Sequence, residues 1–379
     1  MVGRIAGGSA APVAAVPFDA WSGEPRHSDM DFELSEDQLA LREAARGLLA
    51  DRSSPSRVRA VVDRGDGLDP ELWKAMAIQG WTGLEVPESQ GGLGLGAVEA
   101  AVLLEEVGRH LAPAPFLSSL LAVGALSRAS IAGVTWAEPW VEALLSGDAV
   151  GAVAWDPGAP VLFAPSADVV VARVTGADGT AALVAAEIDA DRRPARQPAM
   201  DLTRQLGWLD LAGRETVRLG GPEAVEALVD RGAAGHAAEM LGGADRALEM
   251  AVEHAKERVQ FGRPIGSFQA VKHRCADMLV DVEGMRSCVY HAAWCISAGD
   301  PEAAVAASTA KVWCSDAAAR VMASCLQVHG GIGFTWEHDL HLYLKRSQLD
   351  QVSFGDAAFH RERLAALLRS RIDSGAGVV

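Results

Sequence analysis

"ERVQFGRPIGSFQAVKHRCADM", residues 257–278, lies between two long runs of helical sequence. The run before it covers about 222–259, and the run after it covers about 267–299. Asp300 and Pro301 then predict the start of a third long helix. Long helices that pack together are typical of a four-helix bundle, so this part of the chain predicts one.

The pattern changes twice upstream of this bundle. Short β-branched segments such as "ADVVVARV" and "TAALVAAEI" are separated by Gly, Pro and Asp and predict strands. The sequence before them is helical, with a capping-box pattern at Ser35 and Gln38 and an N-cap at Asp69 ahead of Pro70. We therefore expect an N-terminal helical domain over 30–144, a shortened β-domain over 145–222 and the four-helix bundle over 223–379.

Composition argues against several classes of protein. The formal net charge of −16 comes without a basic stripe, so a nucleic-acid partner is not expected. The five cysteines form no CxxC pair, which argues against a zinc site or a disulfide framework. No apolar run reaches the roughly 18 residues that span a bilayer. Residues 1–29 lack the apolar core of a secretory signal and predict a flexible extension, so we expect a cytoplasmic protein.

Two stretches resemble the acyl-CoA dehydrogenase family of flavoenzymes. They are residues 257–278 and "CLQVHGGIGFTWEHDLHLYLKR", residues 325–346, and the loop "PESQGGLGLG", residues 87–96, agrees with them. The resemblance covers roughly residues 30–370. It implies an α-helical N-terminal domain, a middle β-domain and a C-terminal four-helix bundle. It also implies FAD, an acyl-CoA substrate, α,β-dehydrogenation by a carboxylate base, and electron transfer to an electron-transfer flavoprotein.

The resemblance assigns a set of residues to the phosphate and adenine end of FAD. A pyrophosphate requires a fixed cation, and a guanidinium is a forked donor suited to it. Backbone that comes close to the phosphates requires glycine. The residues that match the family's positions are Arg258, Gln260, Phe261, Gln269, Gln327, Gly330 and Gly331. In this family they serve a flavin bound mainly by the neighbouring subunit.

The second set of family residues, which holds a subunit's own flavin ring, is altered. The family's T-E-P-G-A-G-S-D segment is "WDPGAPVL" here, with Trp155 in place of the threonine, and E-G-T-x-Q becomes "GDAAF", residues 355–359. The usual catalytic glutamate falls on Gly355, or on Phe354 if the gap is placed differently. The alternative position for the base falls on Gly232. No catalytic residue is assigned.

Asp356 is adjacent to the usual position of the base and has two interpretations. Its shorter side chain could substitute for the glutamate, since a general base must come within about 3 Å of the proton it removes. An aspartate ahead of "AAFHRERLAALL" is also the expected N-cap of the last helix, and we favour the cap.

Three functions follow from these patterns. The first is a subunit without a base, paired in a heterotetramer with a homologous acyl-CoA dehydrogenase chain, as in the enzymes of actinobacterial sterol side-chain degradation that act on bulky ring CoA thioesters. The second is a homotetrameric dehydrogenase that uses Asp356. The third is a non-enzymatic protein that binds flavin or acyl-CoA.

Other residues that invite a functional interpretation have simpler structural ones. Four histidines lack metal-ligand spacing on one helical face: His273, His329, His338 and His341. We expect Cys275 and Cys325 to be core thiols, and the pair Glu105 and Glu106 to belong to a solvated helix face.

Overall fold

The structure, a computed structural model, describes residues 33–373 of the chain. The predicted extension at residues 1–29 lies outside the described residues. Between residues 33 and 373, no helix combines the length and the apolarity that a membrane crossing requires.

The N-terminal region is helical, as predicted. The Ser35 side chain accepts the Gln38 N–H, and the Gln38 side chain accepts the Ser35 N–H, which completes the predicted capping box. Asp69 caps the third helix by accepting the N–H groups of Glu71 and Leu72. The helices are α1 (Glu36–Arg52), α2 (Pro55–Arg64), α3 (Pro70–Ile78), α4 (Ala97–Arg109), α5 (Phe116–Ile131) and α6 (Glu138–Leu145).

The predicted strands form a small mixed sheet with the order β1-β3-β4-β6. Strand β1 runs parallel to β3, and the other neighbours are antiparallel. One face of the sheet belongs to the main core, which it shares with α5 and α7, and the other packs on the connecting segments. The strands are β1 (Gly151–Ala154), β3 (Val169–Thr175), β4 (Ala181–Glu187) and β6 (Val217–Gly220), with β2 (Val161–Leu162) paired to β5 (Leu206–Gly207).

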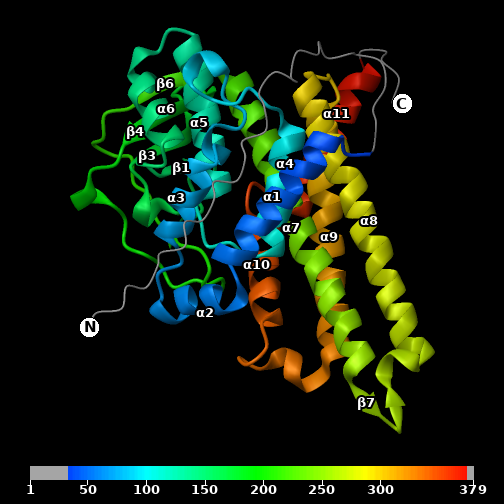
Figure 1. Ribbon diagram of the computed structural model, residues 1–379. Coiled ribbons are helices and arrows are strands. Elements are labelled where there is room, and N and C mark those ends of the chain that lie inside the picture. The colour runs from blue at the N-terminus through cyan, green and yellow to red at the C-terminus, as the bar shows by residue number, and fades with distance from the viewer. Residues whose placement is uncertain (1–32, 374–379) are drawn as a thin grey trace, which may run out of the picture. The chain divides into compact units, whose positions relative to one another are not determined.

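The C-terminal region is built on three long helices that pack against one another, α7, α8 and α9, with α10 and α11 packed on α9. Figure 1 shows β7 at the end of the bundle opposite α11. The sequence pattern did not single out α10. The elements are α7 (Pro222–Glu257), the hairpin of β7 (Val259–Gln260) and β8 (Arg263–Pro264), α8 (Gln269–Ala298), α9 (Ala303–His329), α10 (Leu340–Val352) and α11 (Ala357–Asp373).

Helix α4 is central, and this corrects one expectation. Glu105 and Glu106 are buried, with 5% and 0% exposure, and do not lie on a solvated face. The helix packs against α1, α7 and α8, and a Cβ at Gly242 of α7 would stand 1.8 Å from the Glu105 carbonyl oxygen. The two carboxylates are tolerated in the interior because Arg286 and Tyr290 bond Glu105 and Arg46 bonds Glu106.

Candidate functional site

The predicted cofactor residues all lie at one end of the bundle, the end marked by β7 in Figure 1. They sit at the C-terminus of α7, on the β7–β8 hairpin, at the first residue of α8, near the end of α9 and in the short 3-10 segment Gly330–Phe334. All are exposed to solvent. The structure therefore brings together motifs that are far apart in the sequence.

The polar side chains of the predicted cofactor residues make almost no hydrogen bonds within the described part of the chain. Within residues 33–373, the side chains of Arg258, Gln269 and Gln327 make no hydrogen bond or ion pair, and the Gln260 amide bonds only the carbonyl of Val259. Nothing lies within 4 Å of the place where a Cβ would stand at Gly330 or Gly331. Gly330 has φ +63° and ψ −141°, a conformation that other residues avoid. Free donors beside open backbone suit a phosphate ligand.

Gly232 and the loop at Phe354–Gly355, the positions that the sequence resemblance assigns to the family's base, meet in space. A Cβ built at Gly232 would stand 2.1 Å from Cδ1 of Phe354, so with the phenyl ring in place no larger residue fits at 232. Phe354 and Gly355 both adopt left-handed backbone, with φ of 55° and 90°. This conformation is unfavourable for a phenylalanine and holds its ring inward, where it is 5% exposed.

Trp155 completes an aromatic cluster at this point. Its ring stacks on that of Phe354 with the centroids 5.6 Å apart and the planes at 15°, and it meets the edge of Phe359 at the same centroid distance. The sequence resemblance assigns Trp155 to the family's flavin-bonding threonine, Phe354 to the region of the base and Phe359 to the glutamine. The cavity that remains against Trp155 and Phe354 has a volume of about 110 Å³. Ligand pockets are commonly about 300–1,000 Å³.

Asp356 is exposed, and its carboxylate accepts the Phe359 N–H at 2.8 Å. This is the predicted N-cap of α11. The bond engages one carboxylate oxygen at the start of α11.

A buried ion network contacts the aromatic cluster through His236, whose ring lies 5.6 Å from that of Phe354, and no sequence pattern predicted it. Arg204 bonds both Glu239 and Asp350, and His236 Nδ1 lies 2.9 Å from Asp350 Oδ1. Lys311 Nζ donates to the carbonyl oxygens of Asp350 and Gln351 at 2.8 and 2.9 Å, which fixes the end of α10 just before Phe354. The network therefore holds the loop that carries the aromatic ring.

Burial and charge shape the pKa values in this network. Burial lowers the pKa of His236 to about 4, and it lowers that of Lys311 to about 8. Burial alone would raise the pKa of Asp350, but the neighbouring Arg204 and His236 outweigh it and hold this pKa below its usual range. Potential ligand atoms of His236, Glu239 and Asp350 lie within 4.8 Å of one another. The Arg204 guanidinium already bonds both carboxylates, so these groups form ion pairs within the chain.

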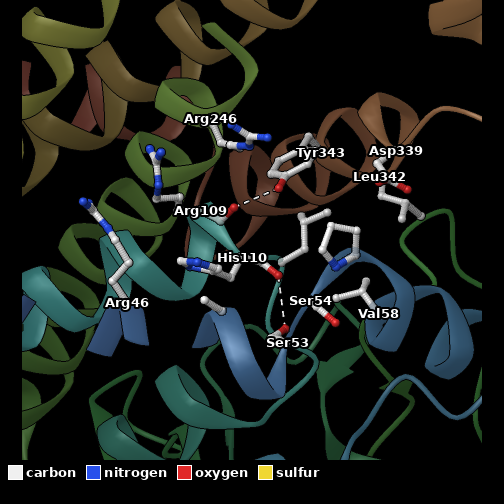
Figure 2. A pocket seen from close by; sticks show the side chains of 13 residues that line it. Arg46, Ser53, Ser54, Val58, Arg109, His110, Arg246, Asp339, Leu342 and Tyr343 are labelled. Carbon is white, nitrogen blue, oxygen red and sulfur yellow. Dashed lines mark hydrogen bonds between the residues drawn. The ribbon is translucent and has the colours of Figure 1, made fainter. Parts of the chain in front are cut away.

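A larger pocket, of about 380 Å³, lies between the N-terminal helices, α7 and α10 (Figure 2). Its wall includes the Tyr343 hydroxyl, which donates to the Arg109 carbonyl at 2.8 Å, and the Ser53 hydroxyl, which donates to the His110 carbonyl at 3.2 Å. None of the predicted cofactor residues lines it. Its three arginines are paired with carboxylates: Arg46 with Glu106, Arg109 with Asp245 and Glu249, and Arg246 with Glu249 and Glu253.

Comparison with known proteins agrees with this architecture. Residues 35–136 match the family "Acyl-CoA dehydrogenase, N-terminal domain", and residues 220–368 match "Acyl-CoA dehydrogenase, C-terminal domain". The chain is 37% identical over 334 residues to acyl-CoA dehydrogenase IpdE2 of Mycolicibacterium smegmatis, which covers 88% of this chain and 99% of that protein. It is 39% identical over 318 residues to IpdE2 of Mycobacterium tuberculosis, which covers 82% of this chain and 91% of that protein.

Among solved structures, the chain is similar to the ChsE4–ChsE5 complex from Mycobacterium tuberculosis, with a TM-score of 0.79, 29% identity, and 90% of this chain and 99% of that chain covered. It is equally similar to a variant of the Tcur3481–Tcur3483 steroid ACAD, with a TM-score of 0.79 and 28% identity. That match covers 89% of this chain and 99% of the other chain.

Proposed function

Since the chain belongs to the acyl-CoA dehydrogenase family, we propose that it is the subunit of a heteromeric acyl-CoA dehydrogenase that carries no base of its own. It would contribute the phosphate-binding end of an FAD site whose ring pocket and base belong to a homologous partner chain. The assembly would oxidise an acyl-CoA at its α,β-bond and pass the electrons to an electron-transfer flavoprotein.

The observation that carries this proposal is the aromatic cluster over Gly232. Neither Gly232 nor Gly355 has a side chain that can take a proton, and the rings of Phe354 and Phe359 fill the space next to Gly232 and Gly355, respectively. FAD is the cofactor of this family. The residues at the bundle end fit its phosphates, whereas the 110 Å³ cavity beside Trp155 does not fit its ring system.

The exposed surface at the bundle end supports a partner. Phe261 on the β7–β8 hairpin, and Phe334 and Trp336 after the Gly330–Gly331 turn, are 92%, 74% and 61% exposed. Large apolar side chains left in water next to free polar donors are typical of an interface. A ligand phosphate and a second chain would together cover them.

The solved relatives support a two-chain assembly and suggest a substrate class. One is described as a complex of ChsE4 with ChsE5, and the other as a steroid ACAD of Tcur3481 with Tcur3483. We therefore infer that the acyl group is a bulky ring system. The homotetramer that uses Asp356 is the second candidate, favoured only by the position of that carboxylate next to Gly355.

Expression of this chain alone and together with a homologous subunit tests the proposal. The chain alone should be colourless and should not oxidise ring-bearing or linear acyl-CoA thioesters, and the co-purified pair should do so. The Asp356→Asn variant is the discriminating control, because asparagine retains the N-cap but cannot act as a base. An isolated chain that is yellow, active and inactivated by Asp356→Asn would establish the homotetramer. A yellow but inert chain would indicate a flavin-binding protein.

A further inference from the structure

Three histidine rings from separate segments stack at the bundle end. His254 in the last turn of α7 stacks on His329 at the end of α9, with centroids 4.6 Å apart and planes at 24°. His329 in turn meets His338 at 4.5 Å and 60°. The middle ring is 5% exposed and the outer two are half-buried. Sequence spacing alone gave these residues no common role.

Hydrogen bonds fix where protons lie on two of the rings when they are neutral. His338 Nδ1 accepts the backbone N–H of Leu340, the first residue of α10, at 3.2 Å, so this nitrogen carries the lone pair. His329 Nδ1 lies 2.9 Å from the Cys325 carbonyl, which can only accept, so this nitrogen carries the proton. His338 therefore acts as an acceptor at the start of α10 only while its Nδ1 is unprotonated.

The stack connects the two halves of the cofactor motif. The backbone N–H of Arg258 donates to the carbonyl of His254 at 2.9 Å. His329 directly precedes the Gly330–Gly331 turn, and His338 ends the loop that follows it. The contact between the first two rings is thus a side-chain contact between the segment that holds Arg258 and the segment that holds the glycines.

We propose that His254, His329 and His338 are positioning residues that form a pH-sensitive clamp, which holds Arg258 and the Gly330–Gly331 turn together while the rings are neutral and releases the turn when they are protonated. That the clamped groups face an FAD pyrophosphate rests on the proposed function. The clamp itself is a property of this chain alone.

The charged groups around the three histidine rings affect the pH at which the rings take up protons. Burial lowers the pKa of His254, and His329 and Arg258 lower it further against the effect of Glu257. Burial also lowers the pKa of His338; His329, His254 and Arg59 add to this, and Asp339 opposes it. Cys325 is the other titratable group in contact with the middle ring. Both outer rings therefore favour the neutral form in the folded protein.

Protonation would open the clamp by two routes. A proton on His338 Nδ1 replaces the acceptor of the Leu340 N–H with a second donor and places a cation at the positive end of α10. A second proton on the stack would place like charges about 4.5 Å apart. The loop from Gly330 to His338 would then lose its anchor at both ends.

Hydrogen exchange of the Leu340 amide in the isolated chain, without FAD or partner, tests the clamp. After correction for intrinsic exchange, protection of this amide should fall as the pH drops from 7.5 to 5.5, by at most about tenfold, which is the effect when the open state takes up one proton that the closed ring does not. The buried His236 and His360 affect only openings that expose them, and both remain in a His338→Asn variant, so pH dependence that comes from global unfolding persists there and is separated from that of the clamp. His338→Asn should remove most of the pH dependence, because the asparagine oxygen accepts the same N–H and does not titrate.

Two further variants complete the experiment. His254→Phe retains a stacked ring without its proton site and should lose less protection at pH 5.5 than the wild type. His273→Asn, at an exposed position on α8, should behave as the wild type. Protection in the wild type that does not change with pH, or a pH profile that His338→Asn shares with the wild type, would overturn the clamp. FAD that fails to bind the assembled protein at any pH would overturn the proposed function and leave the clamp standing.

Discussion

The ring of Phe354 occupies the space that a side chain at Gly232 would need. Its Cδ1 atom lies 2.1 Å from the position of a Cβ at residue 232. The sequence resemblance assigns the alternative position of the base to Gly232 and the usual one to Gly355, or to Phe354 if the gap is placed differently. The contact means that a base at 232 and the present loop at 354 exclude each other.

Gly232→Ala should therefore destabilise the chain by about 1–3 kcal/mol, the usual cost of overpacking a core. Gly47→Ala is the matched control, since Gly47 lies in an exposed part of α1 with nothing within 4 Å of its Cβ position. This control should be stabilising by up to about 1 kcal/mol. Urea denaturation of the two variants measures both effects. A Gly232→Ala variant as stable as Gly47→Ala would show that Phe354 moves aside freely.

The contact also predicts non-additivity. Phe354→Ala removes the ring that the new methyl group would strike, so the double variant should be more stable than the sum of the single changes predicts, by about 0.5–3 kcal/mol. A double-mutant cycle in urea measures this coupling energy. A coupling energy near zero would mean that the two positions do not compete for space.

Arg258→Ala should weaken FAD binding by the assembled protein. The Arg258 guanidinium has no partner within residues 33–373, and a charge-assisted bond to a phosphate contributes about 1.5–3 kcal/mol, or roughly 10- to 100-fold in Kd. Flavin retained by the complex across a dilution series measures the change. Arg369→Ala, at an exposed site on α11, is the control and should retain the wild-type flavin content. Equal retention in both variants would make Arg258 a surface cation only.

The buried ion network should be sensitive to removal of one partner. Arg204→Met leaves Glu239 and Asp350 without their shared cation in the interior, which typically costs about 3–5 kcal/mol. Arg361→Met removes the same side-chain type from the exposed pair with Asp316 and should cost at most about 1 kcal/mol. Urea denaturation at pH 7.5 compares them. Similar losses in the two variants would show that the buried network adds little.

Global stability should fall as the pH drops below about 6.5. His236 and His360 are buried and neutral, with pKa values of about 4, below the value of an unfolded histidine. The unfolded chain therefore binds more protons between these limits, so the stability present above about pH 6.5 is lost as the pH approaches 4. Each shift of this size corresponds to about 3 kcal/mol.

His360→Gln isolates one of these two histidines. The His360 ring lies 2.8 Å from the Phe354 carbonyl, and a glutamine amide can donate to that oxygen without titrating. The variant should lose less stability than the wild type between pH 7 and pH 4.5. His273→Asn serves as the exposed control. A pH dependence that His360→Gln leaves unchanged would mean that this ring is already protonated in the folded chain.

Local sequence signals predicted much of the fold. Ser35, Asp69 and Asp356 each begin a helix as expected, because a capping interaction depends on residues only two or three positions away. The long helices and the sheet follow from periodicity. That neither Gly232 nor Gly355 can act as a base was also evident from the sequence, because it depends only on residue identity.

Relationships between distant segments could not be predicted in this way. The stacking of Trp155 on Phe354 and of His254 on His329 depends on how the sheet and three helices pack. Burial of Glu105 was missed for the same reason, since a charged pair on a helix predicts a solvated face unless the partner, here Arg286, is known. Arg204 and Asp350 meet only in the folded chain.

The ratio of FAD to protein in the purified assembly tests the central claim most directly. The account predicts one FAD for each pair of unlike chains, because this chain's own ring position holds Trp155 and Phe354 while its bundle end serves the partner's flavin. Visible flavin absorbance set against the protein mass of a co-purified heterotetramer gives this ratio, with the chain purified alone as the reference. One FAD on every chain, or stoichiometric FAD on this chain alone, would contradict the account.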